Sequence, residues 1–140
     1  MLTASIPDLN LVETYLNSDP YGRVSVAFPI NHFTRAEHSA VVYFEVQPGD
    51  YLPTHTDSAE EVLYIVAGEA EATVGEERSR LRAGDLAVVP VMVRHSIANA
   101  ADAPLKVVGF FGESEVVSTF AEPLQPMGLT TLKQGEPAPV

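Results

Sequence analysis

Short runs of alternating apolar and polar residues dominate the chain. From Arg23 onward, apolar side chains recur at Val24, Val26 and Phe28, and this period of two is typical of a β-strand with one buried face. Similar runs follow at close spacing, and glycine or proline punctuates the chain between them. The predicted strands lie around residues 23–28, 38–46, 61–68, 69–75, 79–83, 85–90, 94–99 and 105–111. Short strands joined by tight turns favour an all-β sandwich or barrel.

The two ends of the chain show a weaker pattern. In the leader before Arg23, the stretch LNLVETYL is compatible with a turn of helix or with an edge strand. After Gly112 the alternation loosens, and prolines argue against regular structure, particularly beyond Lys133. We therefore expect one domain over residues 1–140, with a core barrel at about 23–112. We expect the tail, 113–140, to be irregular, to wrap around the domain and to fray at its end.

Composition narrows the possible functions. The chain has 140 residues, enough for one domain with a proper core, and 46% of them are hydrophobic. Nineteen acidic residues against eight basic ones give a net charge of -11, which disfavours binding to nucleic acid or to an anionic membrane. There is no cysteine, so a metal ion would have to be held by nitrogen and oxygen.

No targeting or membrane signal stands out in the sequence. The first residues lack a basic start followed by an apolar stretch, and no run of apolar residues is long enough to cross a bilayer. We therefore expect a cytoplasmic protein.

Four titratable residues with suitable spacing are candidate metal ligands. On a strand, His55 and Asp57 point to the same face, about 6.5 to 7 Å apart, and both can reach one ion. The same parity, continued across a short bend, brings Glu61 to this face, and His95 is the only histidine further along the chain. Each such residue is individually more often an ordinary buried or solvated side chain, but their joint placement favours a site. Two imidazoles with one or two carboxylates suit divalent iron, manganese, nickel, zinc or copper.

The spacing of these residues and of several glycines resembles the two sequence motifs of the cupin family. The first motif is matched by Gly49, Pro53, His55, Glu61 and Gly68, and the second by Gly84, Pro90, His95 and Asn99. Two positions depart from the pattern: Asp57 stands where the family has a second histidine, and Met92 stands where it has a glycine.

The resemblance implies a double-stranded β-helix, a small barrel of two antiparallel sheets with the metal inside and a mouth that admits substrate. Its ligands would be His55, Glu61 and His95. Asp57 would then be either a fourth ligand, which makes the site nearly neutral and a weaker Lewis acid, or a base beside a bound water. Asp57 and Glu61 are the candidate catalytic residues.

Three functions follow as alternatives. The first is a metal-dependent enzyme that acts on a small organic molecule, by a dioxygenase-type oxidation or as an isomerase or lyase. The second is a non-catalytic module that binds a small ligand. The third is a 2-oxoglutarate-type iron oxygenase that uses His55, Asp57, His95 and Lys106; it is ranked lower because it leaves Glu61 unexplained and because strand parity points Lys106 outward.

Strand parity also predicts a pocket and a partner. We expect Phe44, Ile97 and Phe111 to face the interior and line a substrate pocket, with His38 at its mouth. The opposite parity predicts an outer face that carries Tyr43, Glu45, Tyr64 and Val66. Apolar side chains there suggest that something covers this face, and we expect a homodimer.

Overall fold

The structure is a computed structural model that describes residues 1–137, and its regular elements are almost all β-strands. The strands are β1 (Val12–Tyr15), β2 (Arg23–Ile30), β3 (Ala40–Val46), β4 (Tyr51–Asp57), β5 (Glu61–Ala67), β6 (Glu69–Val74), β7 (Glu77–Arg82), β8 (Leu86–Val89), β9 (His95–Ala98), β10 (Leu105–Phe111), β11 (Val117–Leu124) and β12 (Leu129–Lys133). Two short 3₁₀ turns, η1 (Ile6–Asp8) and η2 (His32–Thr34), complete the set. Among the described residues there is no helix long and apolar enough to cross a membrane.

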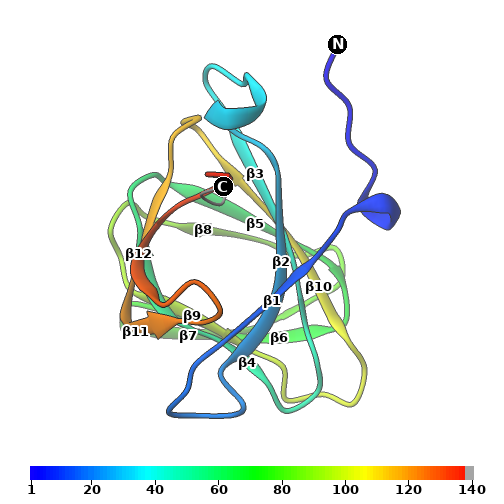
Figure 1. The fold of residues 1–140 in the computed structure, drawn as a ribbon. Helices are drawn as coiled ribbons and strands as arrows, with labels where there is room; N and C mark the ends of the chain where they lie inside the picture. The colour runs from blue at the N-terminus through cyan, green and yellow to red at the C-terminus, as the bar shows by residue number, and fades with distance from the viewer. Residues whose placement is uncertain (138–140) are drawn as a thin grey trace.

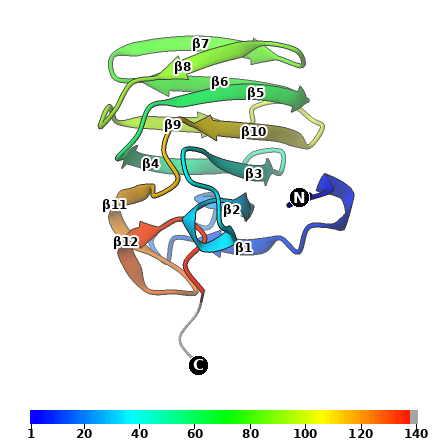
Figure 2. The same ribbon diagram turned by 90° about the horizontal axis from the view of Figure 1, so that it is seen from above.

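The strands form two six-stranded antiparallel sheets that face each other (Figure 1). The first sheet has the order β1-β2-β3-β10-β5-β8, and the second has the order β12-β11-β4-β9-β6-β7. Seen from above, β7 and β8 lie at one end of the molecule, and β1 and β12 lie toward the other (Figure 2). Successive strands thus alternate between sheets through much of the chain, and the predicted double-stranded β-helix is confirmed.

The core lies between the two sheets, and strict alternation places it there. Along β4 and β5, the odd-numbered residues from Pro53 to Ile65 are buried, including those in the bend between the strands. The main apolar cluster draws on both sheets; among its members are Val42, Phe44, Leu63, Ile65, Val89, Ile97, Val107 and Phe111. Burial of such side chains is the dominant favourable term in folding. The site residues of β4 and β5 therefore share a face with this core.

Two turns show how the motif positions work. Gly68, between β5 and β6, has a φ of +85°, and a Cβ there would lie 2.7 Å from the carbonyl oxygen of Pro104, so glycine is required. Met92 adopts a φ of 61° in the turn before β9, although it is not glycine. Its backbone N–H donates to the carbonyl oxygen of Asp57 at 2.9 Å. The turn is thus formed despite the substitution.

The two ends of the chain are more regular than the sequence suggested. In the leader, the edge-strand alternative holds, because β1 pairs antiparallel with β2. The expectation of an irregular tail after Gly112 was wrong up to Lys133, because β11 and β12 form an antiparallel pair at the edge of the second sheet. It is confirmed for residues 134–137, which contain no strand or helix. Pro123 misled the prediction because it falls in a part of β11 with no ladder partner, where a missing N–H costs little. The end of the tail, where fraying is predicted, includes residues 138–140, which lie outside the described residues.

Candidate metal centre

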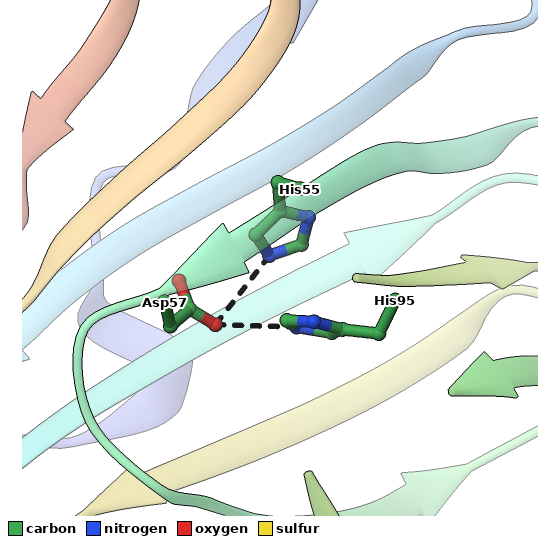
Figure 3. A group of neighbouring side chains, drawn as sticks. All are labelled: His55, Asp57 and His95. Carbon is green, nitrogen blue, oxygen red and sulfur yellow. Dashed lines mark ion pairs between the residues drawn. The ribbon is translucent and has the colours of Figure 1, made fainter. Parts of the chain in front are cut away.

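Three strands bring the four candidate ligands together between the sheets. His55 and Asp57 lie on β4 and His95 lies on β9, its neighbour in the second sheet, where His55 and His95 are direct cross-strand partners. Glu61 comes from β5 in the opposite sheet. All four residues are buried. The rings of the two histidines lie 4.2 Å apart between centroids, and Asp57 lies beside both (Figure 3).

The same local contact orients both imidazoles. Nδ1 of His55 lies 2.8 Å from the carbonyl oxygen of Pro53, and Nδ1 of His95 lies 2.9 Å from the carbonyl oxygen of Val93. A carbonyl can only accept, so in each ring Nδ1 carries the hydrogen and donates it. The lone pair of a neutral ring is then on Nε2, the nitrogen that faces Asp57. A backbone partner of this kind is typical of a metal-binding histidine.

The two oxygens of the Asp57 carboxylate lie in different surroundings. Oδ1 accepts a hydrogen bond of 2.6 Å from the hydroxyl of Ser118. Oδ2 lies 3.6 Å from Nε2 of His55 and 3.1 Å from Nε2 of His95. Although they are this close and buried, neither Asp57 Oδ2 nor His95 Nε2 has a hydrogen-bond partner. Buried polar atoms without partners are costly, so this arrangement favours a cation here, either a proton on His95 or a metal ion held by both atoms.

A divalent cation fits this gap. The ligand atoms of His55, Asp57 and His95 all lie within 4.8 Å of one another, so one ion could contact all three. Two imidazole nitrogens and one carboxylate oxygen form a donor set that suits transition metals.

Glu61 lies at the margin of this group. Its Oε1 is 3.5 Å from Nε2 of His95, but Glu61 is not part of the compact three-residue cluster. Its side chain occupies space that Gly109 leaves open, because a Cβ on Gly109 would overlap Glu61 Oε2 and approach Val42. Gly109 on β10 is a residue whose role the sequence analysis missed.

The electrostatics of the site follow from burial and from these contacts. Burial raises the pKa of Glu61, and contact with His95 only partly offsets this effect. Burial also acts to raise the pKa of Asp57, but the two histidines outweigh it and hold the pKa well below its usual range. For His95, burial lowers the pKa, but the carboxylates of Asp57 and Glu61 outweigh this and raise the pKa to about 10. Without a metal ion, a proton on His95 therefore takes the place of the cation.

The structure places the other predicted residues in two environments. Phe44, Ile97 and Phe111 are buried in the core between the sheets, whereas His38 is exposed and precedes β3. His38 is therefore not brought into the same environment as the other three. Their roles in binding a substrate stay predictions.

Three residues beside the site escaped the sequence analysis because they lie in the supposedly irregular tail. Ser118 contacts Asp57, Gln134 contacts Ser118, and the ring of Phe120 stacks on His55 with 4.7 Å between centroids. The only signal in the sequence was the alternation of Ser118 and Phe120, which share a buried face. A polar residue followed by an aromatic one is too short a pattern to predict a strand.

Two antiparallel sheets enclosing a His-Asp-His cluster define a β-barrel protein with a candidate metal site in its interior. Residues 42–111, half of the chain, match the family model described as Cupin domain. The chain belongs to this family. The resemblance stated from the two motifs is thereby confirmed.

Solved structures agree with the assignment of the fold. The oxalate decarboxylase of Lactobacillus farciminis, in a formate complex, is 25% identical over 83% of this chain and 34% of its own, with a TM-score of 0.70. The oxalate decarboxylase of Bacillus subtilis, in a structure at pH 4.6, is 24% identical over 71% of this chain and 27% of its own, with a TM-score of 0.62. The chain thus spans about a third or less of the length of these enzymes.

A third structure is similar over nearly the whole chain. It comes from Acidithiobacillus ferrooxidans and is described as a proposed sugar phosphate isomerase. It is 19% identical over 96% of this chain and 85% of its own, with a TM-score of 0.65, and this likeness shows the fold alone. A comparison of this chain with curated protein sequences found no match.

Proposed function

We propose that the chain holds one divalent transition metal ion through His55, Asp57 and His95, and that it catalyses an oxygen-dependent oxidation of a small organic molecule. The observation that carries this proposal is the pair of buried, unpartnered atoms, Asp57 Oδ2 and His95 Nε2, 3.1 Å apart beside His55. Two histidines and one carboxylate are the ligand set of non-haem iron(II) oxygenases. When bound, the ion would supply Lewis acidity and redox chemistry beside the apolar interior.

The geometry favours Asp57 as a direct ligand over Asp57 as a base acting on a bound water. Its Oδ2 lies close to both imidazole nitrogens rather than short of them, and the three ligand atoms form one compact group. Glu61, which lies beside His95 alone, then either completes the coordination or handles protons next to the ion.

The charge distribution supports an uncharged, largely apolar substrate. Every lysine and arginine of the chain is exposed or half-buried, so none lies in the core beside the site. Lys106 is half-buried between Leu105 and Val107, which face the core, so it lies on the outer face of β10. An anionic substrate, such as oxalate, a sugar phosphate or 2-oxoglutarate, would therefore find no lysine or arginine inside to pair with its charge. This argues against the 2-oxoglutarate-type alternative.

A proton-transfer reaction of the isomerase or lyase class is a second candidate, favoured by Glu61. Burial raises the pKa of this carboxyl group and brings it nearer to neutral pH, where a general acid or base works best. Glu61 would then move a proton on a substrate held at the ion.

Metal analysis tests the proposal first. Protein purified without chelator is expected to contain about one transition metal ion per chain, and His95→Ala is expected to lose it. His32→Ala is the matched control, because His32 is exposed and its ion-pair partner, Glu115, lies outside the cluster. No metal in the unaltered protein, even after reconstitution, would favour a non-catalytic ligand-binding module.

Oxygen consumption separates the remaining functions. If the proposed oxidation is right, protein reconstituted with iron(II) should consume oxygen with small apolar substrates and without an added cosubstrate. Uptake that depends on 2-oxoglutarate would identify the alternative oxygenase, and turnover without oxygen would identify the isomerase or lyase.

A further inference from the structure

Strand β11 holds two contacts to the metal site, although it lies outside the part of the chain that matches the family model. That match ends at residue 111, whereas β11 begins at Val117. In the pairing of β11 with β4, Ser118 is the direct partner of Asp57, and Phe120 is the direct partner of His55. Direct cross-strand partners on one face have Cβ atoms about 4.5–5.5 Å apart, close enough for side-chain contact. The register thus sets one β11 side chain against each of two candidate ligands.

A directed chain of hydrogen bonds runs from the end of β12 to Asp57. Nε2 of Gln134 donates to Oγ of Ser118 at 3.0 Å, and the Ser118 hydroxyl donates to Oδ1 of Asp57 at 2.6 Å. The direction is unambiguous because the amide nitrogen can only donate and an ionised carboxylate can only accept. The single hydroxyl hydrogen of Ser118 is therefore donated to Asp57. All three side chains are buried.

We infer that Ser118 and Gln134 are positioning residues that make Asp57 a ligand through Oδ2 alone. With Oδ1 engaged by Ser118, only Oδ2 faces the two histidines. Gln134 acts through Ser118, since its contact is to the serine and not to Asp57. The inference rests on the proposed metal site. It adds that the C-terminal strands decide how tightly that site binds.

The chain of contacts is also anchored by the backbone. The N–H of Gln134 donates to the carbonyl oxygen of Val116 at 2.9 Å, and the N–H of Ser58 donates to the carbonyl oxygen of Val117 at 3.0 Å. The N–H of Val117 in turn donates to Oγ of Ser58 at 2.8 Å. These bonds tie down the chain just before Ser118 and at Gln134, so the hydroxyl is held at a defined place. Rigid support of this kind is what a metal ligand needs for high affinity.

Titration of the full-length, metal-free chain with Co(II), in competition with a chromophoric chelator, tests this inference. Ser118→Ala is expected to weaken Co(II) binding about 10–100-fold, as loss of a hydrogen-bond partner of a ligand typically does. It should also change the visible absorption of bound Co(II), because Asp57 becomes free to bind through both oxygens. Ser118→Thr, which keeps the hydroxyl, should largely restore both. Thr119→Ala, on the exposed face of the same strand, should change neither.

Two double variants show whether the effect of Gln134 passes through Ser118 and whether the effect of Ser118 passes through Asp57. Gln134→Leu should weaken binding alone but add nothing to Ser118→Ala. Ser118→Ala should add nothing to Asp57→Ala, whereas a general loss of folding would lower the affinity in that background too. If Ser118→Ala fails to fold, Gln134→Leu with and without Asp57→Ala provides the same comparison.

The possible failures are distinct. If the unaltered chain binds neither Co(II) nor Zn(II), the proposed function is refuted, and this inference with it. If the unaltered chain binds Co(II) but Ser118→Ala has the same affinity and spectrum, only the positioning role is refuted. An equal loss with and without Asp57 would also refute it.

Discussion

At the scale of single residues, each of the three candidate ligands has one polar atom bonded to the protein and a second polar atom left to face the site. In each histidine, Nδ1–H donates a hydrogen bond to a backbone carbonyl, so Nε2 faces the site. In Asp57, Oδ1 accepts a hydrogen bond from Ser118, so Oδ2 faces the site. The lone pairs of these atoms therefore point toward one another, and a proton or a metal ion between them stabilises the arrangement. Which of the two is present depends on pH.

Metal binding is therefore expected to release at least one proton near neutral pH. The pKa of His95, about 10, means that the metal-free protein carries a proton there, and this proton must leave before Nε2 can bind the ion. Apparent affinity should thus rise with pH, by about tenfold per unit for one proton released. Calorimetric titration with Zn(II) at neutral pH, in buffers with different ionisation enthalpies, counts the protons. A count of zero would contradict the electrostatic picture.

At the scale of elements, the alternation along β4 and β5 is the feature that positions the ligands. Buried residues follow one another at every second position across both strands, so Asp57 and Glu61 share the face that also carries Leu63. The turn before β9 matters equally, because it sets where His95 enters the sheet. Met92 holds this turn in a left-handed conformation that usually costs a non-glycine residue about 1–2 kcal/mol.

Met92→Gly is accordingly expected to stabilise the protein. Relief of the left-handed conformation outweighs the extra flexibility of glycine in the unfolded chain, about 0.5–1 kcal/mol, so we expect a net gain of up to about 1 kcal/mol. Met92 is exposed, so little packing is lost. Urea denaturation measures the free energy of unfolding. Val91→Gly is the control, because Val91 is exposed but has no positive φ, and it should destabilise the protein.

At the scale of the whole molecule, the outer face of the first sheet is partly uncovered. Tyr43 is buried there, whereas Glu45 and Tyr64 are half-buried and Val66 is exposed. Further exposed apolar side chains continue this surface on neighbouring strands: Leu86 and Val88 on β8 and Phe110 on β10. Their cross-strand pairs join them, since Leu86 lies opposite Tyr64 and both Val88 and Phe110 lie opposite Val62. β8 is also the edge strand of its sheet.

We propose that a second copy of the chain covers this face in a homodimer. An apolar face beside an open sheet edge suits a twofold pair, in which the same surface is used twice. Leu86→Glu is expected to shift the protein toward the monomer, because Leu86 is 67% exposed on the edge strand of this surface. Met127→Glu, in the turn between β11 and β12, should not. Sedimentation velocity measures both, and a monomeric unaltered chain would contradict the proposal.

The short-range pattern determined which residues share a face. Period-two alternation predicted most strands of the barrel and the common side of His55, Asp57 and Glu61, because side-chain direction in a strand depends only on neighbouring residues. Motif spacing added His95 and the family. The tail was harder to interpret, since prolines obscured a strand whose unpaired part tolerates them.

Only the tertiary structure decided which strands lie side by side. The sequence left Asp57 open as a ligand or a base, because its distance from His95 depends on the pairing of β4 with β9. Nothing in it indicated that Ser118 meets Asp57, because that contact joins residues 61 positions apart along the chain. Periodicity is local and survives in the sequence, whereas register between distant strands is set by packing of the whole barrel.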